Sequence, residues 1–175
     1  WNQRVKNQGE TMACTGFALS AMVEVLAWKA NHEVKNGWPA PEPISPFMLY
    51  YMARRYDDIP GADDDGGSTA RAAMKAWHRH GACKLEFWSE LQTSPSTSGQ
   101  QWVSDAFETP LGAYYRADHT SIPDLHAAVN ETGVVYATAL THAGWDDAQS
   151  DGTIPFAFGA EPDGGHAFLI VGYDD

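Results

Sequence analysis

The feature that most constrains the fold is a run of apolar residues that begins just after Cys14. They recur at mixed three- and four-residue intervals, and they are Phe17, Ala18, Ala21, Met22, Val25, Leu26 and Trp28. This spacing predicts an α-helix, and because the apolar positions cover more than one face, the helix is buried on more than one side. The chain therefore has to fold around a central helix that starts at or near Cys14.

The thiol at the start of this helix is a candidate nucleophile. Partial positive charge at a helix N-terminus favours a thiolate over a thiol. An acyl-transfer site also needs a base or cation beside the thiol and a donor for the developing oxyanion. His166, ahead of apolar residues 167–171, fits the first role, and Gln8, six residues before Cys14, fits the second. The competing interpretation is that Cys14 is a small apolar residue of a core helix.

Three segments of the chain resemble papain-like cysteine peptidases of clan CA, family C1. Val-Lys-Asn-Gln-Gly at residues 5–9 leads to a cysteine at a helix start, as in that family. Gly-His-Ala at residues 165–167 opens an apolar strand that ends in Val-Gly-Tyr at residues 171–173. Gly66 and Gly67 resemble the glycine pair whose backbone binds substrate in the family. The segments span nearly the whole chain in the family's order.

The resemblance implies an α+β, papain-like fold with two lobes in a single domain, residues 1–175. A helical lobe would cover roughly residues 1–110, with the central helix starting at the nucleophilic cysteine. A β-rich lobe would cover roughly residues 111–175. A length of 175 residues with 43% hydrophobic residues agrees with one domain of this size.

The resemblance also implies a site and an activity. Cys14 and His166 would form a thiolate–imidazolium pair, and Gln8 would donate to the oxyanion. The backbone at Gly66 and Gly67, together with Gly165, would bind the substrate. The activity implied is that of a cysteine-type peptidase.

Two departures from the family pattern qualify this interpretation. Thr11 stands where the family has another cysteine, and Thr15 replaces an aromatic residue, as in disulfide-poor bacterial relatives. The family's orienting Asn follows the histidine strand in an Asn-Ser-Trp-Gly-like segment, which is absent up to Asp175. We therefore expect an incomplete β-rich lobe, with the segment supplied by a larger parent polypeptide or a companion chain.

These departures leave two other functions open. One is a catalytically impaired papain-like domain that binds peptides or proteins without cutting them. The other is an amidase or transpeptidase that uses the same acyl-enzyme chemistry, because loops that cannot be decoded from sequence decide the acceptor.

The charge of the chain limits its partners. Eleven Lys and Arg residues against 23 Asp and Glu residues give a net charge of −12. Such a chain repels phosphate backbones and anionic lipid, so we expect neither nucleic acid nor a membrane as partner. The expected partner is a peptide or protein substrate, and no cofactor or metal is expected.

The two cysteines bear on the compartment. If Cys14 is the nucleophile, Cys83 has no partner, so the chain is not a disulfide scaffold. This favours a reducing compartment such as the cytoplasm. Because the sequence starts at Trp1 without a Met, secretion by way of an upstream signal stays open.

Local signals predict further helices and a strand. The expected elements are a helix after Ser45-Pro46, a helix capped by Ser68 or Thr69 that runs through His80 to Gly81, a helix from Ser121 to Gly133, and a strand over residues 134–140. Tyr50 and Tyr51, in the first of these helices, are expected to pack in the core. Loops are expected over residues 31–43, 92–101 and 143–165.

Two groups of polar residues have alternative interpretations. An acidic loop precedes the glycine pair and contains Asp57, Asp58, Asp63, Asp64 and Asp65. Three interpretations of this loop stay open. It is a solvated turn, or a turn that attracts calcium. Alternatively, it places negative charge at the rim of the substrate cleft, which would favour basic substrates.

The second group consists of histidines outside the family pattern. His78, His80 and Cys83 have the composition of a zinc cluster, but histidines two apart on a helix point to different faces, which favours histidines that interact with the helix dipole. His119 and His142 are the fallback candidates for the catalytic base.

Overall fold

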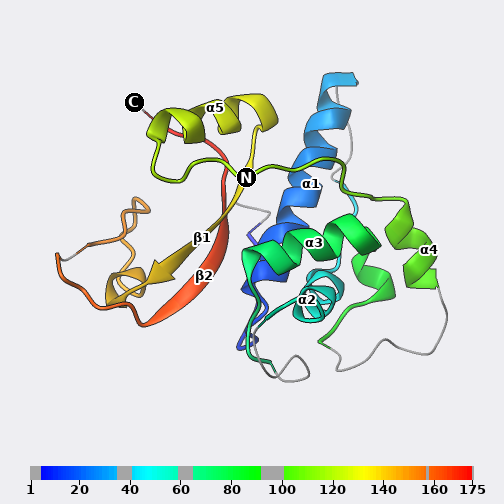
Figure 1. Cartoon of the computed structure of the whole chain (residues 1–175), viewed down its shortest axis with the longest axis horizontal. Helices are drawn as coiled ribbons and strands as arrows, with labels where there is room; N and C mark the ends of the chain where they lie inside the picture. The colour runs from blue at the N-terminus through cyan, green and yellow to red at the C-terminus, as the bar shows by residue number, and fades with distance from the viewer. Residues whose placement is uncertain (1–4, 35–40, 59–64, 92–100, 157, 175) are drawn as a thin grey trace.

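The computed structural model describes residues 5–34, 41–58, 65–91, 101–156 and 158–174. Its elements, in chain order, are α1 (Cys14–Val34), α2 (Pro46–Arg54), α3 (Ala70–His80), the 3-10 turn η2 (Leu85–Phe87), α4 (Gln101–Phe107), α5 (Ile122–Thr132), β1 (Val135–Thr141), the 3-10 turn η3 (Ala143–Trp145) and β2 (Gly164–Ile170). Helices α1, α2 and α3 gather on one side of the molecule, and the two strands lie on the other with α5 beside them (Figure 1). The predicted α+β class is confirmed.

The central helix starts at Cys14, as predicted, and it extends beyond the expected start of the following loop to Val34. Residues 35–40 of that loop lie outside the described residues, as do residues 92–100 of the second predicted loop, whereas residues 41–43 have no regular secondary structure, as expected. Helix α4, which starts at Gln101, was not predicted because Ser, Thr, Gln and Pro dominate the sequence just before it.

The predicted helix caps are present. Ser45 Oγ accepts a hydrogen bond of 3.0 Å from the Met48 backbone N–H, and Pro46 occupies the first turn of α2. Thr69, rather than Ser68, caps α3. Ser121 caps α5 in the same way, and Gly133 ends that helix, so local sequence decided these boundaries correctly.

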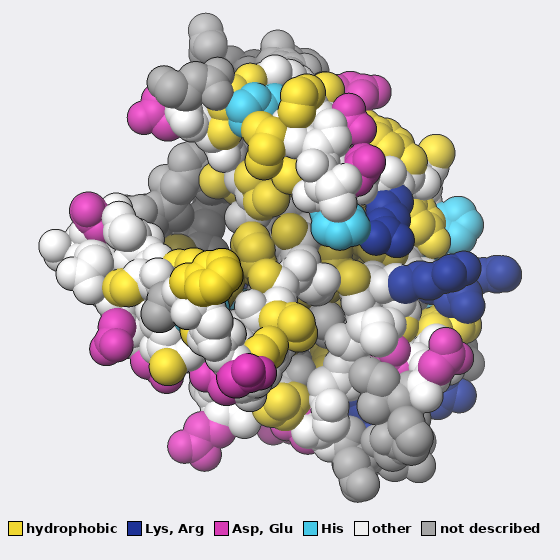
Figure 2. Space-filling model, turned by 60° about the vertical axis from the view of Figure 1, so that its left-hand side comes forward, with side chains coloured by type: hydrophobic (Ala, Val, Ile, Leu, Met, Phe, Trp, Pro, Cys, Tyr) yellow, Lys and Arg dark blue, Asp and Glu magenta, His cyan; other side chains and the backbone are white. Residues whose placement is uncertain are grey.

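Strands β1 and β2 pair antiparallel in the described part of the chain, with Ala139 opposite His166 and Thr138 opposite Ala167. β2 packs against α1, and α5 packs against β1. Figure 2 shows the face on the side of this sheet, where hydrophobic side chains gather in the middle and Asp and Glu side chains are scattered. No helix among the described residues is both long and apolar enough to cross a membrane.

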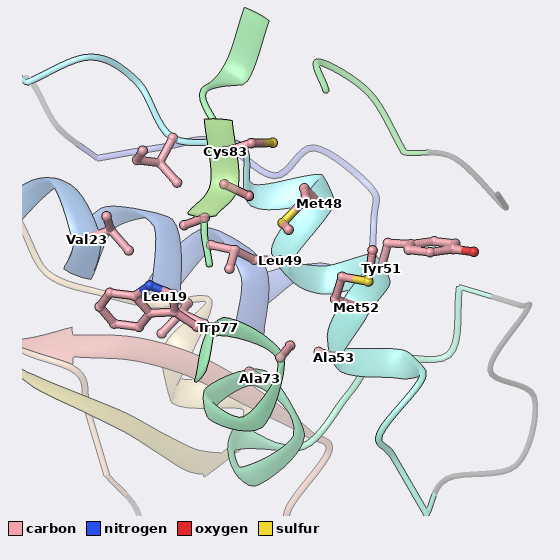
Figure 3. Packing of buried hydrophobic residues seen from close by; sticks show 14 of the residues in the cluster. Leu19, Val23, Met48, Leu49, Tyr51, Met52, Ala53, Ala73, Trp77 and Cys83 are labelled. Carbon is pink, nitrogen blue, oxygen red and sulfur yellow. The ribbon is translucent and has the colours of Figure 1, made fainter. Parts of the chain in front are cut away.

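The main hydrophobic core lies between α1, α2 and α3 (Figure 3). Leu19 of α1, Leu49 of α2 and Ala73 of α3 are fully buried there. Tyr50 and Tyr51 are also buried, which confirms their predicted packing role. This core holds the first half of α1 rigidly, because a close-packed interior leaves little room for displacement.

The first turn of α1 lies against the start of α2 at Gly16. A Cβ atom at residue 16 would overlap the Pro46 carbonyl oxygen and would come within 2.7 Å of Tyr50 Cβ. Both neighbours belong to a buried helix and cannot rotate away. Only glycine therefore permits this helix contact.

We predict that Gly16→Ala lowers the free energy of unfolding by about 1–3 kcal/mol, because the added methyl group overpacks the contact between α1 and α2. Urea denaturation followed by circular dichroism measures this change. Gly112→Ala is the matched control, since a Cβ there meets nothing within 4 Å. Equal stability of the two variants would contradict the proposed contact.

Candidate functional site

Cys14 is the first residue of α1 and is half-buried, with buried neighbours Ala13 and Thr15 on either side. The first turn of α1 is held to the sheet by Tyr136 of β1, whose hydroxyl donates to the Thr15 carbonyl oxygen at 3.2 Å. Burial raises the pKa of Tyr136, and its electrostatic interaction with Cys14 adds to the shift. The phenol therefore stays protonated beside the thiol and remains a donor.

Gln8 lies in a tight turn whose hydrogen bonds are local. Its backbone carbonyl oxygen accepts a 2.8 Å bond from Thr11 Oγ1, and its side-chain Nε2 donates to the Thr11 carbonyl oxygen at 2.8 Å. A carboxamide nitrogen carries two N–H groups, so the second N–H of Gln8 is left for another acceptor. Gly9, with φ of 60°, permits the turn.

The chain just before this turn is anchored by Lys6. Its Nζ donates to Glu24 Oε1 at 2.6 Å, to Ser20 Oγ at 2.9 Å and to the Ile44 carbonyl oxygen at 3.2 Å. Burial lowers the pKa of Lys6, and the neighbouring Glu24 opposes this shift. Glu24 and Ser20 are buried residues of α1, so Lys6 ties the segment that carries Gln8 to the middle of that helix.

Gly66 and Gly67 lie beside the segment that precedes Cys14. The Gly67 backbone N–H donates to the Tyr50 hydroxyl at 2.9 Å. Ser68 shares a short hydroxyl–hydroxyl hydrogen bond with Thr15, the second residue of α1. The structure therefore brings the predicted glycine pair, the first turn of α1 and the Gln8 turn together.

His166 is the third residue of β2, whereas the sequence placed it just ahead of a strand. Its ring is half-buried and meets the Trp145 ring edge to face, with centroids 6.1 Å apart. Trp145 also contacts Phe168. β2, the strand that carries His166, packs against α1, and β1 supplies the Tyr136 hydroxyl to the first turn of that helix.

Gly165, the third glycine of the predicted substrate site, is exposed and pairs with Leu140. Leu140 is 69% exposed. Gly165 and its strand partner are thus both exposed to solvent beside His166.

The fallback histidines have other roles. His142 Nδ1 accepts a 3.1 Å hydrogen bond from the Gly144 N–H and so caps the turn η3. His119 is exposed in the turn that precedes α5. Within the described part of the chain, no hydrogen bond or ring contact joins His119, His142 or His166 directly to Cys14.

The residues of the suggested zinc cluster have other partners as well. His80 Nε2 is 2.7 Å from the Tyr56 hydroxyl, and His78 packs against Tyr114. Burial, with Arg55 and Arg79, lowers the pKa of His80, which disfavours the charged imidazolium expected from an interaction with the helix dipole. Among the residues described, no three His, Cys, Asp or Glu side chains are grouped as a metal site.

Two aspartates of the acidic loop bind protein donors. Asp57 accepts from the Thr69 N–H and hydroxyl, and Asp65 accepts from the Met12 N–H and the Tyr50 hydroxyl. Asp63 and Asp64 lie outside the described residues. Asp57 and Asp65 are therefore hydrogen-bonded to protein donors, while Asp65 is also exposed to solvent, and sequence patterns do not reveal such long-range acceptors.

Comparison with known proteins gives matches among solved structures. No protein-family model matches the chain, and no curated protein matches it. A crystal structure of xylellain, a cysteine protease from Xylella fastidiosa, is similar with a TM-score of 0.75 and 24% identity, over 98% of this chain and 66% of that one.

Two further structures agree. Digestive procathepsin L 3 of the Tenebrio molitor larval midgut matches with a TM-score of 0.65 and 22% identity, over 95% of this chain and 50% of that one. The Carica candamarcensis cysteine protease CMS1MS2, solved in complex with E-64, matches with a TM-score of 0.57 and 17% identity, over 99% of this chain and 75% of that one. The chain therefore has the papain-like fold of these cysteine proteases and spans about two thirds of the length of xylellain.

Proposed function

We propose that this chain carries the catalytic centre of a cysteine peptidase, with Cys14 as nucleophile, His166 as acid and base, and Gln8 as oxyanion donor. One observation supports the proposal above all. Within a papain-like fold, the half-buried thiol of Cys14 begins the central helix, and its first turn is bonded both to the loop of the glycine pair and to the sheet that carries His166.

The first half of the reaction is an acyl transfer to sulfur. The Cys14 thiolate attacks the peptide carbonyl carbon, a C–S bond forms, and the electron pair of the carbonyl moves to oxygen. Cys14 is the first residue of α1, so its backbone N–H has no acceptor within the helix. This N–H and the second N–H of Gln8 stabilise the oxyanion. The imidazolium of His166 then protonates the leaving amine as the C–N bond breaks.

The second half returns the enzyme to its starting state. Neutral His166 removes a proton from water, which attacks the thioester carbonyl carbon. The C–S bond breaks, Cys14 leaves as a thiolate, and the new carboxylic acid departs. Atoms and charge balance without a cofactor in this sequence of steps.

Substrate backbone is expected to pair with the chain at Gly66. The Gly67 N–H is already donated to Tyr50, whereas Gly66 is exposed and a Cβ there would meet nothing within 4 Å. We therefore assign the pairing to the Gly66 backbone and the neighbouring carbonyl of Gly67. We assign Gly165, which is exposed beside His166, to the substrate site as well.

We further propose that a parent polypeptide or a companion chain completes this centre with a group that orients the His166 ring. The described contact of the His166 ring is the edge-to-face contact with Trp145. This contact limits rotation of the ring, but it supplies no hydrogen-bond acceptor that would fix which ring nitrogen carries the proton. Peptide cleavage is therefore assayed with this chain alone and with a C-terminal extension of the papain type.

We predict that iodoacetamide alkylates Cys14 far faster than Cys83 in the folded protein. Cys83 is fully buried, and burial, with the charge of Asp105, raises its pKa to about 12. The Cys83 thiol therefore stays protonated at neutral pH, and a thiol is a poor nucleophile compared with a thiolate. Mass spectrometry of the digested protein locates the label, and unfolded protein, in which both thiols react, is the control.

Removal of the proposed base changes the pH dependence of this reaction. His166→Ala should abolish alkylation of Cys14 at acidic pH while leaving it at alkaline pH, because the imidazolium no longer stabilises the thiolate. Equally slow labelling of Cys14 and Cys83 in the unmodified protein would refute the nucleophile assignment.

We predict that Gln8→Ala lowers kcat for a peptide substrate by roughly 100- to 1,000-fold, the usual cost of one lost oxyanion donor. Gln149→Ala is the matched control, because the Gln149 amide also donates to a nearby backbone carbonyl oxygen, that of Asp147, outside the site. Cleavage is followed by chromatography of the products. Retention of full activity by Gln8→Ala would remove Gln8 from the mechanism, and peptide binding without cleavage would favour the impaired, peptide-binding alternative.

A further inference from the structure

Asp65 lies where three parts of the candidate site meet. Its carboxylate accepts hydrogen bonds from the Met12 backbone N–H, at 3.1 Å to Oδ1 and 3.0 Å to Oδ2. Oδ1 also accepts from the Tyr50 hydroxyl at 2.7 Å. Met12 belongs to the segment between Gln8 and Cys14, Tyr50 belongs to α2, and Asp65 itself directly precedes Gly66.

Tyr50 connects this carboxylate to the helical core. Its ring is fully buried, and its backbone lies so close to Gly16 that the position of α2 against the first turn of α1 cannot vary. Its hydroxyl donates to Asp65 and accepts from the Gly67 N–H. Burial, with the charge of Asp65, raises the pKa of Tyr50, so the donor proton is present throughout the neutral range.

The same loop has a second link to α1. Ser68 and Thr15 share a hydrogen bond between their hydroxyl groups. Asp65 and Ser68 therefore hold the glycine pair from both sides against residues that flank Cys14. Both cysteines of the chain are free, so this junction is held without a disulfide.

The hydrogen bond between Asp65 and the Met12 N–H affects the proposed oxyanion donor through the Gln8 turn. Thr11, the neighbour of Met12, accepts the Gln8 side-chain N–H and donates its hydroxyl to the Gln8 carbonyl oxygen. A shift of Met12 would therefore move the Gln8 amide and the Cys14 N–H relative to the substrate-binding Gly66. Misplacement of reacting groups by about 1 Å can cost roughly 100-fold in rate.

We propose that Asp65 is a positioning residue that clamps the oxyanion-binding turn to the substrate-binding glycine loop. This inference rests on the function proposed above. The carboxylate does not touch the reacting atoms. It sets the distance between the groups that do, and it acts together with the Tyr50 hydroxyl as one unit.

The test compares Asp65→Ala, Tyr50→Phe and the double variant in peptide cleavage, with rates normalised to Cys14 titrated by iodoacetamide. Asp65→Ala should lower kcat by roughly 10- to 100-fold, and the double variant should lose no more than Asp65→Ala alone, since both act through one network. Asp118→Ala is the matched control. The Asp118 carboxylate also accepts a backbone N–H and a hydroxyl, both from Thr120, in an exposed turn.

Asp65→Asn is the conservative variant, because its amide oxygen can still accept from both the Met12 N–H and the Tyr50 hydroxyl; it should restore kcat to within a few-fold of the unmodified protein. If Asp65→Ala does not fold, Tyr50→Phe, which removes only the hydroxyl, carries the test and should also lower kcat. Unchanged kcat in Asp65→Ala, or in Tyr50→Phe where it replaces that variant, would overturn the proposal, as would losses that multiply in the double variant. An unmodified protein that neither cleaves peptide nor labels selectively at Cys14 would instead refute the proposed function, so the two failures are distinguishable.

Discussion

The close approach of α1 to α2 at Gly16 is the constraint on which the rest of the site depends. Because residue 16 has no side chain, the backbone of Tyr50 lies directly against the first turn of α1. That contact fixes the Tyr50 hydroxyl at a point from which it reaches both Asp65 and Gly67. A packing feature two residues from Cys14 therefore determines where the polar groups of the candidate site lie.

Around this contact, polar groups of distant segments are joined to α1. Lys6 binds Ser20 and Glu24 within the helix, and Tyr136 binds the carbonyl oxygen of Thr15. These bonds link the N-terminal segment and the sheet to one buried helix. The Lys6 bonds are charge-assisted, and such hydrogen bonds are stronger than neutral ones, so the N-terminal segment is the more firmly held of the two.

Much of this arrangement was predictable from local sequence. Apolar spacing indicated the helix at Cys14, Ser45 and Ser121 indicated caps, and Gly81 and Gly133 marked helix ends, because each signal acts within a few residues. The α+β class followed from the same signals together with the resemblance to papain-like enzymes.

The missed features depend on contacts between residues far apart in sequence. Tyr136 is 121 positions from Thr15, and Asp65 is 53 positions from Met12. Nothing in the local sequence around a strand tyrosine or an aspartate of an acidic loop indicates such distant partners. Trp145, which contacts His166, was likewise hidden in a segment rich in Gly and Asp. The division into lobes near residue 110 stays a prediction.

The central claim is that Cys14 forms a covalent acyl intermediate during peptide hydrolysis. The most direct measurement mixes the protein with an activated peptide ester, quenches the reaction in acid within one turnover, and determines the mass of the intact and digested protein. We expect an added acyl mass on the peptide that contains Cys14, which disappears as product forms. Turnover of the ester without an adduct, or an adduct on Cys83 that persists, would contradict it.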